Sequence, residues 1–124
     1  MSLKESGEMY LETIYILCKS KSSVRSIDVA EYMNFSRASV SRGIGLLKKQ
    51  DFILMDREGY ITLTDSVLKT AEKIYERHTV ISILLMAMGI DEKTATEDAC
   101  RIEHVISDKT FEAMKQHAEK YKKE

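Results

Sequence analysis

The 124-residue chain contains no proline, no tryptophan, only five glycines and only two cysteines. Because proline is absent, no helix is kinked or broken by a proline, and long helices are possible. Cys18 and Cys100 are too few for the disulfide framework of a small secreted protein. No apolar run approaches the roughly 20 residues that span a bilayer, and Met1–Glu5 lacks the apolar stretch of a signal peptide. These absences predict a cytoplasmic protein without a membrane partner.

The charges are unevenly distributed along the chain, although the net charge is only −1. Residues 19–50 hold seven Lys and Arg side chains against two acids, whereas residues 91–107 hold five acids against two cations. A basic segment favours an anionic partner, and an acidic segment favours a cation. The sequence therefore indicates two different partners for its two ends.

Helical spacing of apolar residues and turn-forming residues predict six helices and one β-hairpin. The predicted helices are Glu5–Lys19, Ser26–Met33, Ser36–Gln50, Thr64–Met88, Asp91–Ile106 and Ser107–Tyr121, and the predicted strands are Phe52–Met55 and Tyr60–Leu63. The expected N-cap residues are Ser26, Ser36, Thr64 and Ser107. Gly59 suits the hairpin turn because glycine accepts a positive φ. Val40, Ile44 and Leu47, with Leu46, are expected to face the core.

The order of these elements is typical of a winged helix-turn-helix. A short helix, a tight turn at Asn34–Phe35, a longer helix and a hairpin follow one another. We therefore predict a mainly α fold, with a winged helix-turn-helix domain at residues 1–66 and a helical domain at residues 67–124.

The helix that begins at Ser36 is the candidate DNA-reading element. Residues 36–50 hold four cations and no acid. The start of such a helix enters the major groove, where arginine contacts guanine and serine contacts phosphate or base edges. The predicted DNA-contacting residues are Ser36, Arg37, Ser39, Ser41 and Arg42, with Arg57 at the hairpin tip. The alternative is a solvated helix in a winged helix that binds protein.

A second candidate site lies in the acidic segment. Cys100, Glu103 and His104 share one side of a helix because they are three and four residues apart. Thiolate, carboxylate and imidazole together suit a first-row transition metal better than Mg²⁺ or Ca²⁺. Further ligands are expected from His78, Met9 and Glu12. Each of these residues alone is more often a core or surface residue, so the prediction depends on the combined Cys-x-x-Glu-His pattern.

Several stretches resemble the DtxR/MntR family of metal-dependent repressors over nearly the whole chain. They are residues 8–15, the helix-turn-helix, residues 75–78 and, most specifically, residues 98–107. The resemblance implies metal ligands at the positions of Met9, His78, Cys100, Glu103 and His104. It also implies a helical dimerisation domain, a homodimer on a double-stranded DNA operator, and metal-activated repression of metal-uptake genes.

Two features of the resemblance bear on the metal. Met9 and Cys100 are similar to the iron-responsive branch, whereas Glu12 is similar to the manganese branch. Ser82 and Thr96 occupy positions where the iron branch has ancillary-site ligands, so that second site looks depleted. Ligand softness favours Fe²⁺, followed by Mn²⁺, with Co²⁺, Ni²⁺ or Zn²⁺ binding in vitro.

Two other regulators remain as alternatives. A MarR-like winged-helix regulator would bind a small organic effector, and a thiol redox sensor would use Cys100. An enzyme is not expected, because no separate nucleophile or base accompanies the proposed ligands.

Overall fold

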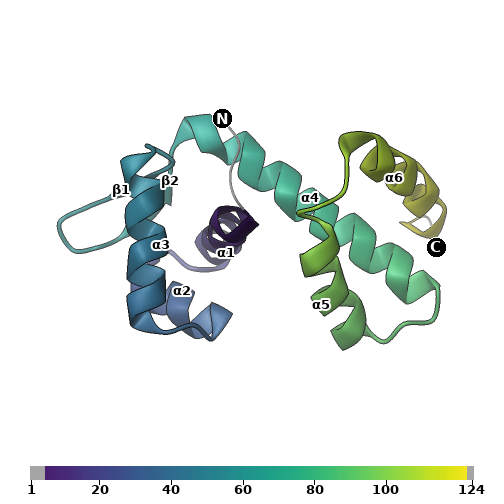
Figure 1. The fold of residues 1–124 in the computed structure, drawn as a ribbon, viewed down its shortest axis with the longest axis horizontal. Helices are drawn as coiled ribbons and strands as arrows, with labels where there is room; N and C mark the ends of the chain where they lie inside the picture. Colours follow the sequence, from purple (N-terminus) through teal and green to yellow (C-terminus); the bar gives the residue numbers. More distant parts are fainter. Residues whose placement is uncertain (1–4, 123–124) are drawn as a thin grey trace. The chain divides into compact units, whose positions relative to one another are not determined.

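A computed structural model describes residues 5–122, so residues 1–4 and 123–124, including most of the N-terminal stretch considered above, lie outside the described residues. The described elements follow the order α1 (Glu5–Ser20), α2 (Ser26–Met33), α3 (Arg37–Lys49), β1 (Ile53–Met55), β2 (Ile61–Leu63), α4 (Asp65–Ala87), α5 (Glu92–Ile102) and α6 (Asp108–Lys122) (Figure 1). This order confirms the predicted mainly α fold. None of the helices in this range is both long and apolar enough to span a membrane.

The chain forms two compact units that divide within α4, after Glu72. The first unit contains α1, α2, α3 and the hairpin, and the second contains most of α4 with α5 and α6. The domain boundary predicted after residue 66 stays a prediction.

The first unit has its own apolar core. Helix α1 contributes Leu11 and Ile14, which are fully buried, and α3 contributes Val40, Ile44 and Leu47. The strands add Ile53 and Ile61. Leu46, expected to face inward, is instead 63% exposed. At about 100° per residue it lies roughly 120° from Val40 around the helix, so the helical spacing itself turns it outward.

The helix-turn-helix is held by local hydrogen bonds. Asn34 ends α2 in the left-handed conformation with φ of 58°. The Ser36 hydroxyl caps α3 by accepting a hydrogen bond from the Ser39 N–H at 3.2 Å, which confirms that N-cap. The expected cap at Ser26 is wrong, because Arg25 occupies the N-cap position and its N–H donates to the Asp28 carboxylate at 2.8 Å.

The hairpin is the predicted wing. Its antiparallel strands pair Ile53 with Leu63 and Met55 with Ile61, and Gly59 turns with φ of 86°. The Ile61 N–H also donates to the Val24 carbonyl at 2.7 Å, which attaches β2 to the segment before α2. Thr64 precedes α4 as expected, but its hydroxyl lies 2.9 Å from the Asp51 carbonyl and donates back toward β1.

The second unit packs α4 against α6 around a small core of Val80, Leu84, Phe111 and Ala118. The Asp91 carboxylate caps α5 by accepting from the Thr94 N–H. The Ser107 hydroxyl accepts from the Thr110 N–H at 3.1 Å, as expected of the cap before α6. The predicted extension of the fifth helix to Ile106 is wrong, because α5 ends at Ile102 and residues 103–106 form a turn.

Candidate metal centre and nucleic-acid interface

The three predicted ligands of the acidic segment lie where α5 ends. Cys100 is in the last turn of α5, Glu103 is its C-cap residue, and His104 follows in the turn. The Glu103 N–H still donates to the Ala99 carbonyl at 2.9 Å, so the backbone stays helical up to this point. The one-sided placement predicted from the i, i+3, i+4 spacing therefore persists although the helix ends early.

The Glu103 carboxylate is the centre of this group. Its side chain is fully buried, and its Oε2 lies 3.1 Å from Nδ1 of His78 on α4. Its Oε1 lies 3.2 Å from Nε2 of His104, whose side chain is 1% exposed. A buried carboxylate is costly unless it is paired and hydrogen-bonded. Two imidazoles, those of His78 and His104, thus lie beside one buried carboxylate.

The donor set fits a transition metal. The Cys100 sulfur, a Glu103 oxygen and a His104 nitrogen lie within 4.8 Å of one another, and His78 contacts the same carboxylate. These side chains offer sulfur, oxygen and nitrogen donors, the mixture that borderline first-row ions accept. The second unit therefore brings together four of the six predicted metal ligands.

The remaining two predicted ligands, Met9 and Glu12, belong to α1 in the first unit. Glu12 is buried and Met9 is partly buried. They are one helical turn apart on the same helix, as the sequence indicated. Their participation in the same metal site stays a prediction.

The two positions expected to lack ancillary ligands carry only hydroxyl groups. Ser82 is buried on α4. The Thr96 hydroxyl donates to the Glu92 carbonyl of its own helix at 2.9 Å. Neutral hydroxyls are poor partners for a divalent ion beside thiolate and imidazole donors.

The predicted DNA-contacting residues line the outer side of the first unit. Ser36, Arg37, Ser41 and Arg42 are exposed, and Ser39 is partly buried. The Ser39 carbonyl accepts a hydrogen bond from the Tyr10 hydroxyl at 3.2 Å, which ties the first turn of α3 to α1.

The outer face of α3 also carries a groove of about 430 Å³. It is lined by Ser41, Arg42, Gly45, Leu46 and Lys49. Gly45, Leu46 and Lys49 were not predicted as candidates, although the helical spacing of residues 41, 42, 45, 46 and 49 places all five on one face of the helix. An exposed leucine beside cations suits a surface that contacts both phosphates and base methyl groups.

Arg57 is exposed at the tip of the wing, as predicted. The wing is held by Arg25, whose guanidinium donates to the Glu58 carbonyl and lies 5.3 Å from the centre of the Tyr60 ring. Lys21 pairs with Asp28 at 2.7 Å. These two cations therefore have partners within the protein, so the cations best placed for a nucleic acid are those of α3 and Arg57.

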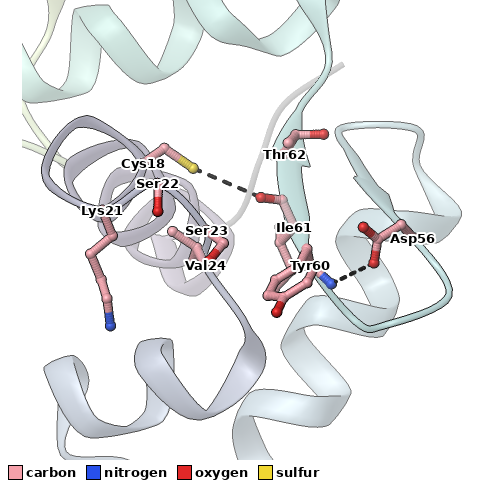
Figure 2. Close-up of a pocket in the computed structure, with 9 residues that line it drawn as sticks. All are labelled: Cys18, Lys21, Ser22, Ser23, Val24, Asp56, Tyr60, Ile61 and Thr62. Carbon is pink, nitrogen blue, oxygen red and sulfur yellow. Dashed lines mark hydrogen bonds between the residues drawn. The ribbon is translucent and has the colours of Figure 1, made fainter.

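A separate cavity of about 360 Å³ lies between the wing and the segment after α1 (Figure 2). Figure 2 shows the Cys18 thiol directed at the Ile61 carbonyl, with its sulfur 3.9 Å from that oxygen. Burial raises the pKa of the Cys18 thiol. A raised pKa lowers the fraction of reactive thiolate at neutral pH.

Comparison with known proteins identifies two family domains along the chain. Residues 2–65 match the model of the iron dependent repressor N-terminal DNA binding domain. Residues 64–124 match the iron dependent repressor metal binding and dimerisation domain. An uncharacterized HTH-type transcriptional regulator of Methanocaldococcus jannaschii is 34% identical over 97% of this chain and 98% of its own length.

Solved structures show the same fold. The manganese regulator SloR has a TM-score of 0.80 and 27% identity over 94% of this chain. IdeR of T. acidophilum has a TM-score of 0.77 and 25% identity, also over 94% of this chain. The chain spans 54% and 55% of those two proteins. With both domain models matched in order, the chain belongs to the family of iron-dependent repressors, which are transcriptional regulators and not enzymes.

Proposed function

We propose that this protein is a metal-activated transcriptional repressor that binds double-stranded DNA as a homodimer and controls metal-ion homeostasis genes. The observation that carries the proposal is the buried Glu103 carboxylate between the imidazoles of His78 and His104, with the Cys100 sulfur beside it. This group lies in the unit that matches the metal-binding and dimerisation domain.

The proposed effector is Fe²⁺, with Mn²⁺ next. A thiolate and, from α1, the Met9 thioether are soft donors that favour Fe²⁺, whereas the carboxylates of Glu12 and Glu103 also accept Mn²⁺. SloR is described as a manganese regulator, so Mn²⁺ remains the second choice. When bound, the ion would act as an effector that holds donors from different helices together.

The proposed mechanism is a population shift. An ion shared between α1 and the helical unit would restrict how each DNA-binding head is placed within the dimer. Two α3 helices would then match successive major grooves, about 34 Å apart. The ion changes the DNA affinity only if it binds the DNA-competent arrangement more tightly than the others.

The DNA contacts are assigned to the exposed face of α3 and the wing. Arg37 and Arg42 would contact guanine edges or phosphates, and Arg57 would contact a neighbouring phosphate. Leu46 would contact a thymine methyl group, since it is large, apolar and 63% exposed.

The homodimer is assigned to the second unit. Met88, just after α4, is 75% exposed, and Met86 in the last turn of α4 is also exposed. Flexible, apolar methionines at a helix end suit a protein interface. Sedimentation of Met88→Lys should give a weaker dimer than the wild type does.

The test is fluorescence-anisotropy binding to the DNA upstream of the protein's own gene, measured without oxygen at one fixed salt concentration. Chelator, Fe²⁺ and Mn²⁺ are compared for the wild type and for Glu103→Ala. We expect tight binding only with metal, and loss of that activation in the variant. The matched control is Glu97→Ala, which removes an exposed acid from the same helix and should behave as the wild type does.

Circular dichroism must show that Glu103→Ala remains folded, and Cys100→Ser provides a second, milder ligand change. Equal DNA binding in chelator and in metal would contradict the proposal and favour an organic effector. Loss of binding upon thiol oxidation alone would favour a redox sensor.

A further inference from the structure

We infer that Arg77 is a positioning residue for the metal centre: its guanidinium holds the turn that carries Glu103 and His104, and so sets the affinity for the ion. This inference rests on the proposed metal function. Arg77 lies on α4 immediately before His78, and its side chain is only 12% exposed.

The contacts of Arg77 are with the backbone of the ligand turn. Its Nη1 donates to the carbonyls of both Glu103 and Ile106, each at 3.0 Å. Its Nη2 pairs with the carboxylate of Asp108, the first residue of α6. One side chain thus contacts the first and last residues of the turn and the first residue of the helix that follows it.

These contacts provide hydrogen-bond donors for carbonyl groups near the end of α5. The last carbonyls of a helix have no partner within the helix. A cation at that end also interacts favourably with the partial negative charge of the helix dipole. Arg77 supplies donors just beyond the point where α5 ends, and its fixed planar fork can serve two acceptors at once. Its guanidinium also lies 5.3 Å from the centre of the Phe111 ring, which keeps it in place from the α6 side.

Arg77 and His78 hold the same residue from two directions. Arg77 binds the Glu103 carbonyl, while His78 contacts the Glu103 carboxylate. Neighbouring residues of α4 therefore fix both the backbone and the side chain of this ligand. Without Arg77, residues 103–106 would sample more conformations, and metal binding would have to order them first.

Partners that orient ligands in this way change metal affinity by about 10- to 100-fold when they are replaced. The proposed variant is Arg77→Lys, which keeps the positive charge but cannot reproduce the fork. The matched control is Glu76→Gln, because Glu76 is the preceding residue of α4 and joins α6 through Lys115 at 2.9 Å. That control breaks an α4–α6 contact without touching the ligand turn.

The experiment is titration of the full-length protein with Co²⁺ under nitrogen, followed by the visible and near-ultraviolet absorption of a thiolate-bound ion. We expect Arg77→Lys to bind Co²⁺ on the order of 10-fold more weakly or worse, with the thiolate band retained at saturation. Glu76→Gln should bind Co²⁺ as tightly as the wild type does.

The outcomes separate the two proposals. If the wild type gives no thiolate-bound Co²⁺ spectrum, the metal function itself fails. If the wild type binds but Arg77→Lys binds equally well, or if Glu76→Gln loses as much affinity, the positioning role is overturned. Should Arg77→Lys fail to fold, Asp108→Asn replaces it, because it removes the carboxylate that pairs with both Arg77 and Lys73, and Lys73→Gln is then its control. Co²⁺ affinity that is unchanged in Asp108→Asn, or equally weakened in Lys73→Gln, would also overturn the inference.

Discussion

Two glycines of α3, two residues apart, should differ in their response to the same substitution. A Cβ on Gly43 would overlap the Tyr10 ring, with Cζ at 2.6 Å and Cδ2 at 2.9 Å. A Cβ on Gly45 would meet nothing within 4 Å. Tyr10 is only 7% exposed, its hydroxyl donates to the Ser39 carbonyl, and its ring forms an edge-to-face pair with Phe35. The ring therefore has little freedom to withdraw.

The expected size follows from two opposing effects. Replacing glycine by alanine inside a helix stabilises by about 1 kcal/mol at either position. Overfilling a packed core costs about 1–3 kcal/mol, and only Gly43→Ala incurs this cost. Because the helix term is common to both variants, Gly43→Ala should be less stable than Gly45→Ala by about 1–3 kcal/mol.

The assay is urea unfolding followed by circular dichroism. Protein concentration is held fixed because dimerisation would contribute to the measured stability. We expect Gly45→Ala to unfold at a higher urea concentration than the wild type, and Gly43→Ala at a lower one than Gly45→Ala, with similar slopes. In a Tyr10→Leu background the penalty of Gly43→Ala should shrink. Equal midpoints for the two single variants would refute the reasoning.

Three further predictions concern the cap of α3, the acid in the first turn of α2, and metal removal. Ser36→Ala should lose about 1 kcal/mol in thermal unfolding, because the Ser39 N–H loses its acceptor; an equal loss in the exposed Ser41→Ala would contradict this. A hydrogen bond from Lys21, then one from the Arg25 N–H, lowers the pKa of Asp28. Its stabilising effect is therefore present above the unfolded-state value of about 3.9 and is lost as the pH falls through the lowered pKa. Asp28→Asn should accordingly be less stable than the wild type at neutral pH, with the difference vanishing in acid; a constant difference in urea midpoints across that range would be inconsistent. Mn²⁺ at about 100 times its dissociation constant should stabilise the wild type by about 2.7 kcal/mol, and chelator should reverse this; an equal gain in Glu103→Gln would exclude Glu103 as a ligand.

Local signals were enough to predict most of the fold. Ser36 and Ser107 are caps because a hydroxyl needs only the backbone three residues ahead. Gly59 takes a positive φ because the hairpin turn needs it. Both kinds of signal are contained within a few residues, so periodicity and turn chemistry suffice to locate them.

The error at the end of the fifth helix arose where distant residues decide the structure. The fifth helix was predicted to reach Ile106 because its apolar spacing continues, but Arg77, 26 residues earlier than Glu103, takes up carbonyls in the turn. Spacing also grouped Cys100, Glu103 and His104, and His78 was predicted as a further ligand of that site, but the direct contact between His78 and Glu103 was not predicted. Pairings between α4 and the end of α5 depend on packing, which a single sequence does not reveal.

The second unit has features that suit a regulatory metal ion better than a structural one. Structural zinc domains depend on the metal for folding because they lack a sufficient core. Here α4 and α6 share a core of Val80, Leu84, Phe111 and Ala118. The buried Glu103 carboxylate already has two imidazoles at 3.1 and 3.2 Å. An ion held by these side chains would replace those contacts and would not simply add to them, so part of its coordination energy would offset the contacts that it breaks. We therefore expect a moderate net affinity, as a regulator needs if it is to release its ion when the supply falls.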